Sequence, residues 1–156
     1  MKKVLIILVT IMACAGFSAR ADKSALEQSF TNEVKKFLVS EGYAPTIDED
    51  GDVKFKYEGD TFFVIVATYG DGYYVKVVGF MDASDAGRRG VLEACNETER
   101  SLRYVRCYLN NQNDIVYECA GFFANLYQFK LMFPDFMSVL KSSDKKLKEV
   151  YNEFDN

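Results

Sequence analysis

The spacing of hydrophobic residues changes along the chain, and these changes predict the order of its helices and strands. Apolar residues recur every three or four positions in residues 24–42, as on one face of a helix. Residues 53–81 alternate with period two or run continuously apolar, which is typical of strands. Strand patterns return in residues 102–123, and helical spacing returns from Phe136 to Phe154. With a helix between the two strand regions, the predicted order is α-β-β-β-α-β-β-α, an α+β fold with an antiparallel sheet packed with helices.

The first helix carries a signal at each end. Ser24 and Glu27 have capping-box spacing, in which each side chain accepts a hydrogen bond from the other residue's free backbone amide. Gly42 suits the left-handed conformation that ends many helices. The apolar stripe between these signals consists of Leu26, Phe30, Val34, Phe37 and Leu38.

A meander of three strands is expected next, at Val53–Tyr57, Thr61–Thr68 and Tyr73–Met81. The first strand alternates apolar and charged residues, so one face is buried and the other is solvated. The second strand is apolar on both faces, which indicates a central strand. Glu58-Gly59-Asp60 and Asp71-Gly72 are expected to form the connecting turns, and Gly79 to mark a bulge.

The second half of the domain is expected to hold a helix, a hairpin and a closing helix. Asp82 or Ser84 should cap the second helix, which extends to about Glu99. Pro134 suits the start of the last helix, because proline is tolerated in the first turn. The hairpin strands are expected at Leu102–Leu109 and Ile115–Phe123.

Residues 1–21 have the layout of a secretory signal peptide. Lys2 and Lys3 precede an apolar run, and Ala19-Arg20-Ala21 offers small residues for cleavage. The run is shorter than a membrane span needs, so we expect an exported, periplasmic protein with no membrane span and a single domain over residues 22–156. Cys14 loosely resembles a lipobox cysteine, so an outer-membrane lipoprotein with a lipid anchor is the alternative.

Composition and charge exclude several functions. The 156 residues include no histidine, which removes every histidine-based base, nucleophile activator and metal ligand. Cleavage would remove three basic residues of 19 and no acidic residue of 23, leaving a formal charge of −7 that disfavours nucleic acid as a partner. The acidic run at residues 48–52 lacks the ligand spacing of a calcium loop and is expected to be a solvated turn. We therefore expect no enzymatic activity, no metal and no cofactor.

Three cysteines remain after cleavage, at positions 95, 107 and 119. Their spacing contains no Cys-x-x-Cys pair, so neither a zinc site nor a thioredoxin-type redox pair is indicated. One hypothesis is that all three are buried thiols, since free cysteine is among the most buried residue types. The other is a disulfide between Cys107 and Cys119, which an exported chain could form.

The strand at residues 61–68 suggests a binding surface, because alternation gives it two apolar faces. Large exposed apolar patches usually mark interfaces. We expect one face to bind a polypeptide or a second copy of the chain. The alternative is that the last helix folds over this face. The predicted contact residues are Phe62, Val64, Val66 and Tyr74.

The segments 53–59, 91–96 and 102–109 together resemble the YbjN-like group, also called bacterial sensory-transduction regulators, of the type III secretion chaperone-like fold. The matching residues are Val53-Lys-Phe-Lys-Tyr-Glu-Gly59, then Val91-Leu-Glu-Ala-Cys-Asn96, then Leu102-Arg-Tyr-Val-Arg-Cys-Tyr-Leu109. The family often has a second asparagine where this chain has Glu99 or Ser101. The resemblance implies a compact, often dimeric α+β domain that binds another protein without catalysis or metal. It makes Asn96 a candidate contact residue, with capping of the following turn as the alternative role.

Two functional hypotheses follow from these observations. The first is an exported, non-enzymatic protein-binding or chaperone-like domain that uses an apolar sheet face. The second is a periplasmic inhibitor-like module, similar to PepSY domains, that presents the loop Tyr69-Gly-Asp-Gly-Tyr73 to an enzyme. An exposed Tyr69 at the tip would favour the second hypothesis and a buried one would remove its basis.

Overall fold

A computed structural model describes residues 23–83 and 87–154 and confirms the α+β fold class. The predicted signal peptide, Cys14 and Ser84 lie outside the described residues. The order matches the prediction, with one additional two-residue strand, β1, before the meander. The described elements are α1 (Ala25–Ser40), β1 (Thr46–Ile47), β2 (Val53–Tyr57), β3 (Asp60–Tyr69), β4 (Gly72–Met81), α2 (Arg88–Ser101), β5 (Arg106–Leu109), β6 (Ile115–Phe123) and α3 (Leu126–Phe154).

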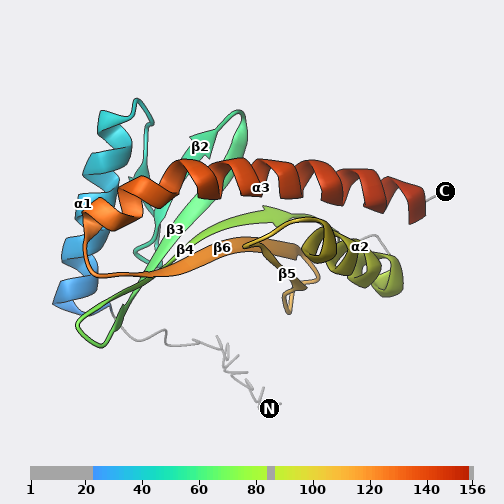
Figure 1. Cartoon of the computed structure of the whole chain (residues 1–156), viewed down its shortest axis with the longest axis horizontal. Coiled ribbons are helices and arrows are strands. Elements are labelled where there is room, and N and C mark those ends of the chain that lie inside the picture. The colour runs from blue at the N-terminus through green and yellow to red at the C-terminus, as the bar shows by residue number, and fades with distance from the viewer. Residues whose placement is uncertain (1–22, 84–86, 155–156) are drawn as a thin grey trace, which may run out of the picture.

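The strands form one sheet in the order β1-β2-β3-β4-β6-β5, with every neighbouring pair antiparallel. The long strands β3, β4 and β6 make its centre, and short strands close both edges. Helices α1 and α3 lie on the same side of the sheet, and α2 lies beside β5 and α3 at one end (Figure 1). Within the described residues, the opposite side of the sheet carries no helix (Figure 1).

The hydrophobic core lies between the sheet and the two helices that cover it. Alternate residues of each strand point into the core, and the ladder aligns them across neighbouring strands: Val64 pairs with Val77, and Val77 pairs with Cys119. Helix α3 contributes a long apolar stripe because its aromatic and aliphatic residues keep helical spacing. The helical core residues include Phe30, Val34, Phe37 and Leu38 of α1 and Phe129, Phe133, Phe136, Met137, Leu140 and Leu147 of α3.

The ends of α1 are those the sequence predicts. The Ser24 hydroxyl accepts a hydrogen bond from the Glu27 backbone, and the Glu27 carboxylate accepts one from the Ser24 backbone. Gly42 adopts a φ of 89°, and its N–H donates to the Val39 carbonyl while that of Tyr43 donates to Leu38. This is the Schellman arrangement, so both helix-end predictions are confirmed.

Helix α3 begins earlier than predicted, so Pro134 lies inside it rather than at its start. The signal for the true start is an asparagine cap that the sequence analysis did not use. The Asn125 side chain accepts from the Gln128 N–H, and the Gln128 side chain accepts from the Ala124 N–H. The first bond satisfies a free amide of the first turn, and the second ties the Gln128 side chain back to the residue before the cap.

The remaining boundary predictions need small corrections. The β3–β4 turn consists of Gly70 and Asp71, not Asp71 and Gly72, because Tyr69 pairs with Gly72. Helix α2 is capped by Gly87 rather than by Asp82. Strand β5 starts at Arg106 rather than Leu102, since α2 continues to Ser101 and a left-handed residue follows at Tyr104, with φ of 65°.

Gly79 does not mark a bulge, because the pairing of β4 continues through it on both sides. It lies opposite Tyr117, and a Cβ atom at Gly79 would stand 2.4 Å from the Tyr117 ring. The glycine is therefore needed to make room for this large buried side chain. The Tyr117 hydroxyl reaches Asp144 of α3 at 3.4 Å.

Candidate interaction surface

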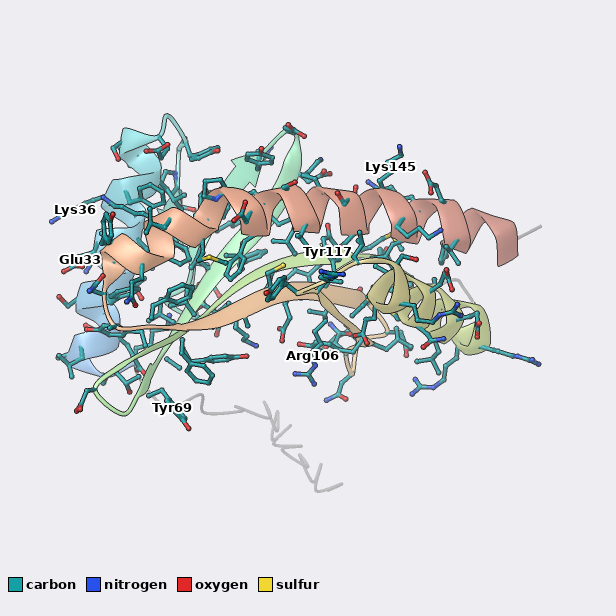
Figure 2. All side chains as sticks on the ribbon, viewed as in Figure 1. Glu33, Lys36, Tyr69, Arg106, Tyr117 and Lys145 are labelled. Carbon is teal, nitrogen blue, oxygen red and sulfur yellow. The ribbon has the colours of Figure 1, made fainter. Side chains whose placement is uncertain are left out.

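The candidate site is the side of the sheet that carries no described helix, which we call the open face. Strand alternation and register place its residues: Tyr74 pairs with Phe122, Val78 with Glu118, and Arg106 with Glu118. Figure 2 shows Tyr117 on the helix side of the sheet and Tyr69 and Arg106 on the opposite side. The open face consists chiefly of Lys54, Lys56, Phe63, Ile65, Tyr69, Tyr74, Lys76, Phe80, Arg106, Tyr108, Glu118 and Phe122.

Three of the predicted contact residues lie in the core instead. Phe62 and Val64 are 0% exposed and Val66 is 3% exposed, because α1 and α3 cover their side of β3. The prediction that these residues form a contact surface is therefore wrong for the folded chain, and the alternative of helix cover is the one observed. Alternation was correctly inferred, but it gives no information about which face the helices cover.

Tyr74, the fourth predicted contact residue, and Tyr69, the predicted loop tip, both lie on the open face and both contact Phe122. The Phe122 ring lies 4.7 Å from the Tyr69 ring and 5.0 Å from the Tyr74 ring, measured between centroids. Tyr69 and Phe122 are 66% and 65% exposed. The sequence analysis missed Phe122, although alternation within Ile115–Phe123 separates it from the buried residues of that strand.

A second aromatic pair lies at the other end of the open face. Phe63 and Phe80 meet edge to face with centroids 5.5 Å apart, and Phe80 is 46% exposed. The Lys54 ammonium lies 5.8 Å from the centre of the Phe63 ring. Aromatic rings with cations beside them are a common contact surface for polypeptides, because they combine apolar area with charge.

Glu118 stands between the two aromatic groups and is only 2% exposed. Its carboxylate accepts hydrogen bonds from Lys76 at 3.2 Å and from the Tyr108 hydroxyl at 3.3 Å, and Arg106 lies 3.6 Å away. Burial and the neighbouring carboxylate raise the pKa of Tyr108, so its hydroxyl stays protonated and able to donate. A buried carboxylate with these partners is a satisfied structural group rather than a free acid.

The open face carries positive charge on an otherwise acidic chain. Lys54, Lys56, Lys76 and Arg106 lie on it, against the single carboxylate of Glu118. This leaves an excess of cations, whereas the expected mature chain has more acidic than basic residues. The open face therefore combines an excess of positive charge with exposed aromatic rings.

Asn96 is not part of the open face. It is exposed on α2, which packs against β5 and α3 at the end of the sheet. The structure thus does not bring Asn96 together with Tyr69 and Tyr74. Its candidate role as a contact residue stays a prediction.

The acidic run at residues 48–52 forms a turn, as predicted. The Asp48 carboxylate accepts hydrogen bonds from the backbone of Asp50 and Asp52, and Lys23 pairs with Asp52 at 2.6 Å. Within the described residues there is no cluster of three potential metal-ligating acidic or cysteine side chains. A cavity of about 320 Å³ between α1, β2 and α3 contains one carboxylate, Glu41, so it offers no carboxylate pair for acid–base work.

The described cysteines, Cys95, Cys107 and Cys119, are all free and buried. The predicted bridge between Cys107 and Cys119 is therefore wrong for this structure. Cys107 pairs across the ladder with Tyr117 and lies on β5, which packs against α2, where Cys95 is also buried. Burial raises the pKa of Cys119 to about 12, which makes it a poor nucleophile.

Comparison with known proteins identifies the family. The YbjN family, described as "Putative bacterial sensory transduction regulator", matches residues 31–124, from within α1 to just beyond β6. The chain belongs to the YbjN family. The predicted resemblance is thus confirmed, and the family description names a regulator rather than an enzyme.

A solved structure supports the same fold. The chain is similar to an uncharacterized protein from Methanothermobacter thermautotrophicus, with a TM-score of 0.55 and 16% sequence identity. The match covers 80% of this chain and 98% of that one. At this identity the likeness concerns the fold alone. No curated protein matches the chain.

The helices were also compared with the length and hydropathy that a membrane span needs. No helix of residues 23–83 or 87–154 is long and apolar enough to cross a membrane.

Proposed function

We propose that this YbjN-family protein is an exported, non-enzymatic domain that binds an acidic polypeptide on the open face of its sheet. The observation that carries the proposal is the open face itself, where exposed aromatic rings lie among lysine and arginine side chains on an acidic molecule. Electrostatic complementarity favours a partner with acidic side chains, and the rings favour apolar residues beside them.

The charge of the open face also favours a different chain over a second copy of this one. Two copies that met face to face would bring together two surfaces that each carry an excess of cations, among them Lys54, Lys56 and Lys76. Like charges at an interface cost free energy unless other groups offset them. Of the two predicted partners, a second copy of this chain is therefore less favoured at the open face than a different, acidic polypeptide.

The binding experiment compares two labelled synthetic peptides of equal length by fluorescence anisotropy. One alternates Glu and Asp with Leu and Phe, and the other carries Lys in place of each acidic residue. We expect the acidic peptide to bind, and the variant with both Lys54→Glu and Lys56→Glu to lose about tenfold in affinity or more. Higher ionic strength should weaken this binding, because exposed charges are screened.

A matched control variant reverses the charge of two exposed lysines on the helix side, Lys36→Glu and Lys145→Glu. Both residues are labelled in Figure 2. This variant has the same net charge as the test variant. Equal loss of affinity in both variants would show that net charge alone matters and would contradict the proposal. Binding of the basic peptide, or of neither peptide, would also contradict it.

The inhibitor-like hypothesis keeps one supporting observation, which is that Tyr69 at the β3–β4 hairpin is 66% exposed. The two hypotheses differ in the residues they need. Tyr69→Ala should weaken binding in both cases, whereas Lys54→Glu with Lys56→Glu should matter only for binding along the open face, because these lysines lie on β2.

Export has its own test. The chain is expressed with a C-terminal tag, the envelope is fractionated, and the mature N-terminus is identified by mass spectrometry. We expect Asp22 as the first residue and periplasmic recovery. A lipid-modified N-terminus at Cys14 would support the lipoprotein alternative, and an uncleaved chain in the cytosol would contradict export.

A further inference from the structure

Two buried cysteines, Cys95 and Cys107, lie on neighbouring elements at the β5 edge of the sheet. Cys95 of α2 and Cys107 of β5 are 4% and 7% exposed, and both lie where α2 packs against β5. Eleven residues separate them in the sequence. The third described cysteine, Cys119, is 0% exposed and lies near the Phe136 carbonyl of α3, at 4.0 Å.

The local structure holds this pair in place. One face of α2 is buried, including Cys95, and β5 alternates so that Cys107 points inward while Arg106 and Tyr108 point to the open face. Glu99, one turn after Cys95 on α2, accepts a hydrogen bond from the Cys107 backbone N–H. The Cys107 backbone is thus bonded to α2 one turn beyond Cys95.

We propose that Cys95 and Cys107 form a disulfide that fastens α2 to the edge strand β5 when the chain meets a disulfide-bonded oxidant. Both cysteines are buried where α2 packs on β5, and the hydrogen bond from the Cys107 backbone to Glu99 holds the two elements together. The proposal is independent of what the open face binds.

The reaction is an exchange of two thiols for one disulfide. The Cys95 thiolate attacks the oxidant R–S–S–R, forming a mixed disulfide and releasing one R–S⁻. The Cys107 thiolate then attacks the Cys95 sulfur and releases the second R–S⁻. The two cysteine protons end on the two released thiolates, so the protein loses two electrons and the oxidant gains them.

The electrostatics of the pair indicate which sulfur reacts first. The hydrogen bond from Cys107 stabilises the Cys95 thiolate and lowers the pKa of Cys95, against the opposing effect of burial. The same bond, together with burial, raises the pKa of Cys107 strongly. Cys95 is therefore the attacking thiol, and Cys107 is the resolving one.

The test equilibrates the mature protein with mixtures of oxidised and reduced glutathione and maps its peptides under non-reducing conditions. We expect one linked peptide pair joining Cys95 to Cys107, two hydrogen atoms lighter than the reduced pair, with Cys119 still free. The oxidised protein should also melt higher than the reduced one, by about 5–10 °C for a short closed loop.

The variants Cys95→Ser and Cys107→Ser should each abolish the linked peptide, whereas Cys119→Ala serves as the control and should retain it. A link from Cys119 to either other cysteine would overturn the proposal. So would mixed disulfides with glutathione at Cys95 or Cys107 that never resolve. The wild-type peptide map decides the question even where a variant fails to fold.

Discussion

The two faces of strand β3 differ in environment far more than in composition. In β3, Phe62, Val64 and Val66 are buried, while Phe63 and Ile65 on the other face are only half-buried. Both sets would suit a core. The difference is that α1 and α3 bring their apolar stripes to one face, and within the described residues no helix covers the other.

This contrast shows why one apolar face of a strand becomes part of the core and the other part of the surface. Among residues 23–83 and 87–154 nothing forms a second layer on the open face, and its rings contact one another and nearby cations instead: Tyr69 and Tyr74 pack on Phe122, and Lys54 lies near Phe63. A partner could therefore bury apolar area there, whereas the covered face has none left to offer.

The largest expected effect separates the two faces within one strand. Phe62→Ala should lower the free energy of unfolding by about 3–5 kcal/mol, because it leaves a cavity in the core. Phe63→Ala, its neighbour on the open face, should cost about 1 kcal/mol or less. Urea unfolding of both variants measures the difference. Equal losses would show that the open face is covered in solution.

The next prediction concerns the close packing of the covered face. Gly79→Ala should destabilise the protein by about 1–3 kcal/mol, since the new methyl group would overlap the Tyr117 ring. In a Tyr117→Ala background the same substitution should cost much less. A double-mutant cycle by thermal unfolding checks this coupling, and additive losses would argue against the contact.

A smaller effect is expected from the charged network of the open face. Lys76→Met should cost about 1–2 kcal/mol, because it removes a donor from the buried Glu118 carboxylate. Arg106→Met should cost less than 1 kcal/mol, as the arginine side chain is 70% exposed. Chemical unfolding at low and high salt measures both. The opposite ranking would mean that Arg106 is the main partner of Glu118.

The smallest effect lies where α1 meets the end of β3. Hydrogen bonds from the backbone N–H of Thr68 and then of Ser24 lower the pKa of Glu27 below its ordinary 4.5. The folded state therefore favours the ionised carboxylate, and its stabilising contribution is present above about pH 4.5 and is lost as the pH falls through the lowered pKa. Glu27→Gln should cost about 0.5–1 kcal/mol at neutral pH.

The measurement for Glu27 is the melting temperature of wild type and Glu27→Gln between neutral and acidic pH. Their difference should shrink on acidification. A difference that is constant across this range would indicate that the ionised carboxylate contributes nothing beyond the capping geometry.

Local signals explain how much of the fold could be predicted. The bounds of β2 and the ends of α1 follow from alternation, a capping box and a glycine, each of which acts within a few residues. The start of α3 is predicted too late because Pro134 is a weaker start signal than the Asn125 cap nine residues earlier. Gly79 was misassigned because its role depends on Tyr117, a partner distant in sequence.

Local periodicity was enough to predict the α+β class and the alternation of every long strand, and the segments 53–59, 91–96 and 102–109 were enough to indicate the family. The sequence could not determine which strand face α1 and α3 would cover, since that choice depends on how distant apolar stripes pack together. The tertiary structure was therefore needed to show that Phe62, Val64 and Val66 are buried and that the candidate site consists of their neighbours on the open face. It also left Cys107 and Cys119 as free buried thiols and placed Cys107 against α2, because α2 packs on β5.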